Sequence, residues 1–128
     1  MTDLPEDRRY TAEHEWARED NGRIVVGVTD FAQDQLGDVV FVGLPEPGTE
    51  VEAGKPLGEV ESTKSVSDIY SPVSGKVVEK NLEVEQAPEL VNEDPYGRGW
   101  LVAIDGGGAG IDSLLSAADY RKLIEGGA

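Results

Sequence analysis

Apolar residues recur in short runs along most of the chain, and turn-forming residues separate these runs. The run Arg23–Val28 (RIVVGV) is rich in β-branched residues and follows the hairpin signal Asn21-Gly22, so it predicts a strand. Asp38–Leu44 (DVVFVGL) predicts a further strand, and Trp100–Ile104 (WLVAI) predicts the last one. Few windows have the length and period of a helix. The pattern therefore predicts a mainly β fold, built as a small antiparallel barrel or sandwich.

Two segments carry helix signals. Residues 29–37 predict about two turns of helix, capped at the start by Thr29 or Asp30 and ended by a glycine. Residues 111–125 predict a C-terminal helical segment, with a start at Ser116 that resembles a capping box. We expect its buried face to carry Leu114, Leu115, Ala118 and Leu123.

Three further segments complete the predicted organisation. Tyr10–Trp16 (YTAEHEW) predicts a short extended piece with an aromatic core residue at each end. Residues 86–99 contain two prolines and two glycines, which predicts a long ordered loop. Gly106–Gly108 predicts a flexible break. At 128 residues, we expect one domain over 1–128, mainly β, with short peripheral helices of which one is C-terminal.

The charge balance restricts the partners of the chain. There are 26 Asp and Glu residues against 11 Lys and Arg, a formal net charge of −15. Phosphate backbones and anionic membrane surfaces repel such a chain, so we expect neither nucleic acid nor membrane as a partner. No apolar run has the length of a membrane span, and residues 1–9 are polar without an apolar signal core. We therefore expect a cytoplasmic protein whose protein partners offer a basic face.

The chemistry available to the chain is limited. There is no cysteine and only one histidine, His14, which excludes disulfides, thiolate nucleophiles and a cysteine or histidine cluster for metal. A hydrolase with paired carboxylates would need an acid pair in an apolar pocket, and no segment has that pattern. We expect no metal site, and only His14 could serve as the base of a Ser–His–Asp triad.

One local arrangement is informative. Leu57–Glu61 and Val66–Tyr70 both alternate like strands, and the four residues between them are small and polar apart from Lys64. This pattern predicts a hairpin with the lysine at its tip. Val60 and Ile69 would face the core, and the flanking acidic residues would face outward.

The predicted tip presents an amine among carboxylates. Nearby carboxylates keep an ammonium group charged and poorly nucleophilic, which argues against Lys64 as a catalytic amine. They do not prevent modification, because a modifying enzyme can remove the proton. From these residues alone, a displayed lysine that is modified and an ordinary surface lysine both remain open.

Gly58–Gly75, GEVESTKSVSDIYSPVSG, closely resembles the lipoyl-lysine motif of the glycine cleavage system H-protein family. Four more segments resemble this family in the same order, and order over separate segments is far more specific than one motif. The resemblance implies a barrel-sandwich hybrid with a lipoyl hairpin at about residues 57–78. It also implies lipoate in amide linkage on Lys64. The further segments are YTAEHEW at 10–16, VGVTDFAQDQLGDVVFVGLP at 26–45, LVNEDPYGRGWL at 90–101 and LLSAADYRKL at 114–123.

The family implies a non-catalytic carrier. Such a protein shuttles the aminomethyl group of glycine from the pyridoxal-phosphate-dependent glycine decarboxylase (P protein) to the aminomethyltransferase (T protein). Dihydrolipoyl dehydrogenase (L protein) then reoxidises its arm. Lipoate-attaching enzymes are further implied partners, and a carrier that visits several enzymes is expected to be a monomer. Tethering raises the effective concentration of the cargo at each enzyme.

The resemblance also implies roles for two acidic residues. Glu15 and Asp68 match family positions that hold the amine of the loaded arm in a surface cleft. An aminomethyl group is cationic near neutral pH, so a pair of carboxylates suits it. Glu13 departs from the small hydroxyl residue that some members carry at this place. His14 is adjacent, and a structural role for it is the simpler interpretation.

Other carriers fit less well. Biotinyl domains place the modified lysine between methionines, whereas Thr63 and Ser65 flank Lys64. Lipoyl domains of 2-oxoacid dehydrogenases usually show Asp-Lys-Ala at the tip. Two alternatives remain: an H-like protein that relays lipoate to other enzymes, and a non-catalytic acidic β binding module.

Overall fold

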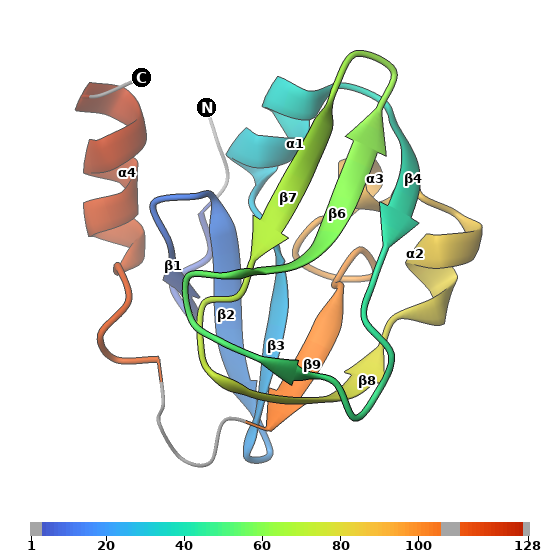
Figure 1. The fold of residues 1–128 in the computed structure, drawn as a ribbon. Coiled ribbons are helices and arrows are strands. Elements are labelled where there is room, and N and C mark those ends of the chain that lie inside the picture. Colours follow the sequence, from blue (N-terminus) through green and yellow to red (C-terminus); the bar gives the residue numbers. More distant parts are fainter. Residues whose placement is uncertain (1–3, 106–110, 127–128) are drawn as a thin grey trace.

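The computed structural model describes residues 4–105 and 111–126, which form nine strands and four helices (Figure 1). The strands run antiparallel, and the helices lie at the periphery, one of them at the C-terminal end. This arrangement confirms the predicted mainly β fold with short peripheral helices. The elements are β1 (Arg9–Tyr10), β2 (Glu15–Asp20), β3 (Arg23–Val28), α1 (Asp30–Leu36), β4 (Val39–Gly43), β5 (Glu50–Val51), β6 (Pro56–Ser62), β7 (Val66–Tyr70), β8 (Gly75–Lys80), α2 (Leu82–Gln86), α3 (Leu90–Glu93), β9 (Val102–Asp105) and α4 (Ala117–Gly126).

The strands form two sheets that enclose the main core. One has six strands in the order β1-β2-β3-β9-β8-β5, and the other has three in the order β4-β6-β7. Alternate residues of both sheets point into the space between them, because successive side chains on a strand face opposite ways. Val26, Val60, Val77 and Ile104 are fully or almost fully buried there.

A second, smaller cluster lies where α4 packs on the six-stranded sheet. Its centre is aromatic: Tyr10, Trp16 and Tyr120 are all 0% exposed, and the rings of Tyr10 and Tyr120 stack with centroids 5.0 Å apart. The Trp16 indole N–H donates to the carbonyl of Pro95 at 3.0 Å. This cluster attaches the C-terminal helix to β1 and β2.

The predicted hairpin turn at Asn21-Gly22 and the predicted helix after Thr29 are both confirmed. Asn21 and Gly22 have φ angles of 53° and 84° and connect β2 to β3 in a tight hairpin, as expected for a two-residue loop with left-handed residues. Helix α1 begins after Thr29, whose hydroxyl accepts a hydrogen bond from the backbone N–H of Ala32. It ends at Gly37, where φ is 80°.

The expectation of one extended piece over Tyr10–Trp16 is wrong. The chain reverses between β1 and β2, so that Tyr10 lies opposite Trp16 in neighbouring strands. The backbone N–H of His14 donates to the carbonyl of Thr11, which closes the turn. The turn contains no Gly, Asn or Pro, and His14 adopts the left-handed conformation with φ 76°. Because the residues that usually mark a turn are absent here, the sequence did not predict this turn.

The expected loop over residues 86–99 is also wrong in part, because it includes the end of α2 and all of α3. Helix α3 has no side-chain cap, and it is only four residues long. Leu90 and Val91 bury their side chains in the main core, and this packing rather than local propensity holds the turn. Asn92 adds a tertiary anchor, since its side-chain oxygen accepts from the Val39 N–H at 2.8 Å.

The C-terminal helix is shorter than expected. It spans Ala117–Gly126, and residues 111–116 are not helical. Leu115 instead forms a bridge to Tyr10. The hydroxyl of Ser116 accepts from the Asp119 N–H at 3.1 Å, as the capping pattern predicts.

The predicted buried face of this helix is also wrong. Tyr120 and Ile124 are its buried residues, whereas Leu123 is 37% exposed. The predicted face, which includes Leu123, is displaced by one position from the face with Ile124 that packs in the aromatic cluster. The break predicted at Gly106–Gly108 lies outside the described residues.

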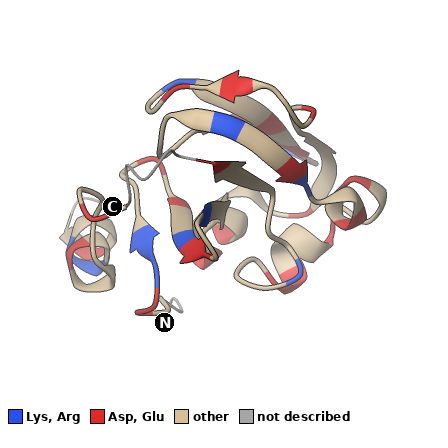
Figure 2. Cartoon of the chain, turned by 90° about the horizontal axis from the view of Figure 1, so that it is seen from below, with Lys and Arg blue, Asp and Glu red and all other residues tan. Residues whose placement is uncertain are grey.

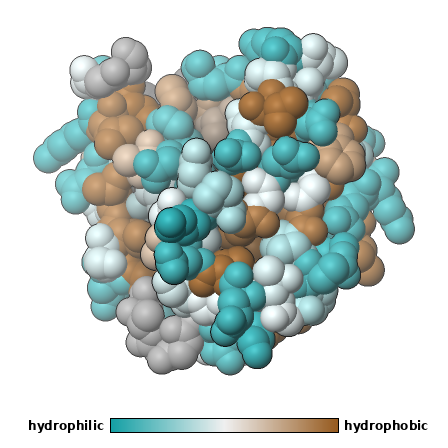
Figure 3. Space-filling model, viewed as in Figure 1, coloured by the Kyte–Doolittle hydropathy of each residue, from teal (hydrophilic) through white to brown (hydrophobic). Residues whose placement is uncertain are grey.

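Acidic side chains are distributed over the strands, loops and helices rather than gathered in one tail (Figure 2). Surface of both hydrophilic and apolar character covers the three-stranded sheet (Figure 3). Val40, Phe41 and Val66 are the exposed apolar residues of that sheet. Among the helices that the structure describes, none is long and apolar enough to cross a membrane.

Candidate functional site

The turn between β6 and β7 presents Lys64 to solvent. Glu61 pairs with Val66 as the strands close, and the Ser62 N–H donates to the Ser65 carbonyl at 2.8 Å. The Ser62 hydroxyl accepts from the backbone N–H groups of Lys64 and Ser65, at 3.3 and 3.1 Å. These hydrogen bonds fix the turn, and the side chain of Lys64 remains exposed. The predicted hairpin with a lysine at its tip is confirmed.

The hairpin faces are arranged as the alternation predicts. Val60 is 0% and Ile69 3% exposed, so both belong to the core. Asp68 is exposed and lies opposite Glu59 in the neighbouring strand. Strand β7 is an edge of its sheet, so one side of its backbone is free of a neighbouring strand.

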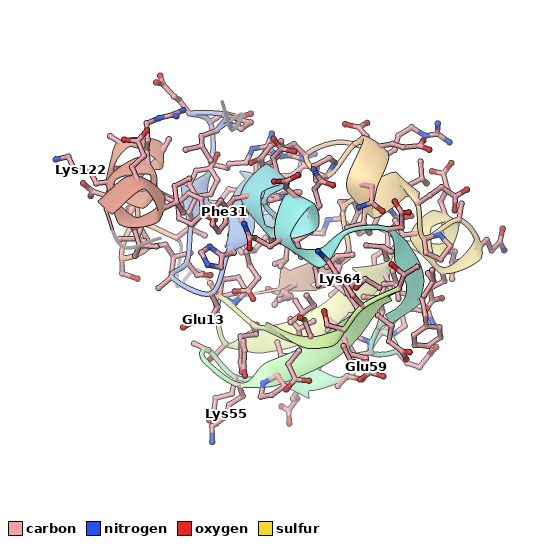
Figure 4. The ribbon with its side chains drawn as sticks, turned by 90° about the horizontal axis from the view of Figure 1, so that it is seen from above. Glu13, Phe31, Lys55, Glu59, Lys64 and Lys122 are labelled. Carbon is pink, nitrogen blue, oxygen red and sulfur yellow. The ribbon has the colours of Figure 1, made fainter. Side chains whose placement is uncertain are left out.

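Lys64 does not extend straight into solvent. Its side chain lies against the end of α1, where a Cβ atom built on Gly37 would come within 3.1 Å of Lys64 Cε. Figure 4 shows the amine of Lys64 next to the end of α1. The stem of the lysine thus runs from the hairpin tip towards α1.

A cleft of about 380 Å³ lies between the edge of β7, helix α1 and the turn that joins β1 to β2. From the turn it receives Glu13, His14 and Glu15, and from the hairpin it receives Asp68 with its neighbours in β7. Helix α1 contributes Phe31, Ala32, Gln35 and Leu36 as the third wall. The structure therefore brings Glu15 and Asp68 to the same cleft, beside the tip that carries Lys64.

Glu15 joins the two sheets. It is only 1% exposed, although it begins strand β2 beside the cleft. The Thr11 hydroxyl donates to its Oε1 at 2.6 Å, and the backbone N–H of Tyr70 donates to its Oε2 at 3.1 Å. Glu15 thereby satisfies a donor on the free edge of β7 and anchors that edge to β2.

Burial raises the pKa of Glu15 to about 7, and the hydrogen bonds from Thr11 and Tyr70 only partly oppose this effect. The nearby charge of Glu13 acts in the same direction as burial. The carboxyl of Glu15 is therefore balanced between its neutral and charged forms near neutral pH. A cation that enters the cleft would favour the charged form.

Several residues of this site were not predicted from the sequence. The Thr11 hydroxyl makes two hydrogen bonds to Glu15: it donates to the carboxyl group and accepts from the backbone N–H at 3.1 Å. The helix of residues 30–36 was predicted without a role, although Phe31 and Gln35 are spaced to share one face. An i, i+4 pair that includes an aromatic residue on a short helix was the only local signal for this wall.

A larger hollow of about 640 Å³ lies elsewhere, lined by β5, β8 and the end of β9. It is more open than the cleft, and it contains none of the predicted site residues. Glu50, Glu52 and Asp105 line it, together with Lys76. The cleft is the candidate functional site, because both predicted carboxylates line it and the turn that carries the exposed lysine lies beside it.

The model of the glycine cleavage H-protein family matches residues 8–126 of this chain. This chain belongs to the glycine cleavage H-protein family. It is 52% identical over 126 residues to the glycine cleavage system H protein of Carboxydothermus hydrogenoformans, covering 98% of this chain and 97% of the relative. It is 49% identical over 125 residues to that of Halalkalibacterium halodurans, covering 97% and 98%.

A solved structure supports the same assignment. The crystal structure of a glycine cleavage system H protein from Mycobacterium marinum superposes with a TM-score of 0.87 at 44% identity, covering 98% of this chain and all of that one. The family confirms the predicted resemblance and the fold. The chain is a lipoyl carrier component of the glycine cleavage system and is not itself an enzyme.

Proposed function

We propose that Lys64 is the residue that carries lipoate, and that the cleft beside it receives the loaded arm. The observation that supports this assignment is the position of an exposed lysine, on a hydrogen-bonded turn, next to a cleft lined by the carboxyl groups of Glu13, Glu15 and Asp68. A covalent arm needs an amine that a modifying enzyme can reach. It also needs a rigid attachment, so that the free end searches a limited volume.

The residues present fit the arm. The cleft volume of about 380 Å³ lies in the range of small-molecule sites. Its walls combine apolar side chains, Phe31, Leu36 and Ile69, with the polar groups of Glu15 and Asp68. This mixture suits an aliphatic chain whose end is polar. When bound, lipoate would supply a disulfide that accepts the aminomethyl group of glycine together with two electrons, and these electrons would stay on the arm as a dithiol until the dehydrogenase removes them.

Asp68 and Glu15 play different parts in holding a cationic cargo. Asp68 is exposed at the rim, so its carboxylate can approach an ammonium group directly. Glu15 is buried beneath and already accepts two hydrogen bonds, so it contributes mainly charge from the floor of the cleft. Because its pKa is about 7, cation binding and ionisation of Glu15 favour each other.

The partners follow from the carrier role. We propose that the chain meets glycine decarboxylase, the aminomethyltransferase, dihydrolipoyl dehydrogenase and a lipoate-attaching enzyme in turn. Each must reach Lys64, and a net charge of −15 favours partners with basic entrances. We propose a monomeric, single-domain carrier over residues 1–128 that works in the cytoplasm without contact with membrane or nucleic acid.

Intact-mass analysis of the protein from its native host tests this function. One lipoyl increment that peptide mapping places on Lys64 is the expected result. An unmodified chain, or an increment on Lys55, would reject the assignment. Lys55 is exposed in the loop before β6 and provides an internal control.

A further inference from the structure

One residue of the cleft has no part in the function proposed above. His14 is half-buried and lines the cleft beside Glu15. Its φ of 76° lies in the left-handed region, at the end of the turn closed by the hydrogen bond from its N–H to the Thr11 carbonyl. Gly or Asn is favoured at such a position. A strained histidine at a binding cleft suggests that its side chain is needed there.

The ring of His14 is connected to the C-terminal helix. Its Nδ1 lies 2.7 Å from the hydroxyl of Tyr120 on α4. The same hydroxyl lies 2.9 Å from the hydroxyl of Thr29, which caps α1. Tyr120 is fully buried and stacked on Tyr10, so its hydroxyl is fixed in place. A chain of three side chains therefore joins α4 and α1 to the cleft.

The hydrogens in this chain can be assigned by their partners. Burial raises the pKa of Tyr120, so its hydroxyl keeps a proton to donate. The Thr29 hydroxyl already accepts from the Ala32 N–H, and Thr29 is 0% exposed. If Tyr120 donated to Thr29, the Thr29 hydrogen would have no acceptor among the described residues. The order that satisfies every group is Thr29 donating to Tyr120, and Tyr120 donating to His14 Nδ1.

This order determines which ring nitrogen of His14 carries hydrogen. Burial lowers the pKa of His14, an effect that the charge of Glu13 partly opposes, so the ring is neutral near pH 7 and has one N–H. With Nδ1 as acceptor, that N–H is at Nε2. Among the described residues, every buried side-chain nitrogen has a hydrogen-bond partner. The Nε2 of His14 has no such partner, so it is not buried and a ligand can reach it.

We propose that His14 presents its Nε2–H to the cleft as the hydrogen-bond donor for an acceptor atom of the lipoyl arm, and that Tyr120 is the positioning residue that fixes this tautomer. The inference rests on the proposed function, since it assumes that the cleft receives the arm. The carboxylates of the cleft, from Glu13, Glu15 and Asp68, are acceptors, and His14 complements them with a neutral donor. The acceptor is either the amide oxygen of the linkage or a sulfur.

The tautomer can be measured before any arm is attached. His14 is the only histidine in the chain, so a long-range ¹H–¹⁵N spectrum of the unlipoylated protein shows a single imidazole. We expect the Nε2–H tautomer in the wild type and a mixture of both tautomers in Tyr120→Phe. Tyr10→Phe is the matched control, because it removes a neighbouring buried hydroxyl that donates to the Pro5 carbonyl rather than to His14. It should keep the wild-type spectrum.

Attachment of two different arms tests the contact itself. Lipoyl and octanoyl chains share the amide oxygen, and only the lipoyl chain carries sulfur. A shift of the His14 Nε2 signal with both chains supports the amide oxygen as acceptor, and a shift with the lipoyl chain alone supports sulfur. His14→Asn, which tolerates positive φ, should release ammonia from the loaded carrier severalfold faster than the wild type.

Two results would overturn the inference. The first concerns the tautomer: the wild type carries its hydrogen on Nδ1, or the spectrum of Tyr120→Phe is identical to that of the wild type. The other is a His14 signal that neither arm moves, although mass analysis finds the arm on Lys64. In that second case the carrier function would stand and only the role of His14 would fail. Absence of modification at Lys64 would instead reject the function, while the tautomer of the free chain would still be measurable.

Discussion

The cleft lies between two turns that hold their residues in different ways. The turn at residues 62–65 is exposed and, apart from Lys64, consists of small polar residues whose side-chain hydrogen bonds stay within the turn. One backbone hydrogen bond leaves it, from the Thr63 N–H to the carbonyl of Asp38 at 3.1 Å, just before β4. The turn at residues 11–14 is tied by Glu15 to β7 and by His14 to α4. One turn therefore presents a reactive group that the fold does not need. The other supplies groups that the fold and the cleft share, so their substitution should affect both.

Lys64→Arg tests this difference most strongly. We expect it to abolish lipoylation and carrier activity, because a guanidinium group does not form the amide. The free energy of unfolding should change by less than about 0.5 kcal/mol, as for an exposed side chain. Mass analysis after treatment with a lipoate ligase, and urea denaturation, measure the two effects. Lys55→Arg should change neither, and modification that persisted in Lys64→Arg would place the arm elsewhere.

Glu15→Gln tests the turn that the fold shares. Since burial raises the pKa of Glu15 from 4.5 to about 7, the folded state binds its proton more tightly than the unfolded chain does. Wild-type stability should therefore fall relative to Glu15→Gln as pH rises from about 4.5 to about 7, and change no further above it. The relative loss should reach up to about 3 kcal/mol, because each tenfold change in proton affinity is worth about 1.4 kcal/mol.

Urea denaturation of both proteins at about pH 5 and about pH 8 measures this difference. Glu19→Gln is the control, since Glu19 lies on the same strand but is exposed. Parallel pH profiles for the wild type and Glu15→Gln would show that Glu15 does not titrate in this range.

Asp68→Asn should affect cargo retention rather than the fold. The exposed carboxylate attracts a cationic group, and an exposed charge pair is worth roughly 0.2–1 kcal/mol. Ammonia release from the loaded carrier should accelerate by at most about fivefold. Glu59→Gln is matched, because Glu59 lies directly opposite Asp68 but does not line the cleft. Equal rates in both variants would make Asp68 an ordinary surface acid.

The same contrast explains what could be predicted from the sequence. The lysine turn was predictable because its signal is local: two segments that alternate like strands, small polar residues between them, and turn-forming glycines on either side of the hairpin. The turn at residues 11–14 was not, because His14 takes a conformation that other residues favour and is held by Tyr120, more than 100 positions away. Helix α3 was missed for a similar reason, since burial of Leu90 and Val91 stabilises it. Glu15 was predicted at the cleft, but not its burial or its bond to Tyr70.

Gly37→Ala should have the smallest effect on carrier chemistry, and it tests whether helix α1 positions the lysine beside the cleft. A Cβ there would lie 3.1 Å from Lys64 Cε, so the lysine stem would move away from the end of α1. Because the contact is with a flexible side chain, we expect only about a twofold change in the rate of lipoylation. Gly54→Ala is the control: Gly54 also has positive φ, 83°, but a Cβ there would meet nothing within 4 Å. Gly54→Ala should lose about 1 kcal/mol of stability through backbone strain. Gly37→Ala should lose roughly 1–3 kcal/mol, because φ 80° and ψ −157° lie in a region that is essentially restricted to glycine. A change in the lipoylation rate confined to Gly37→Ala would show that α1 orients the lysine before any arm is attached, whereas equal rates would leave the tip turn as the sole determinant of its position.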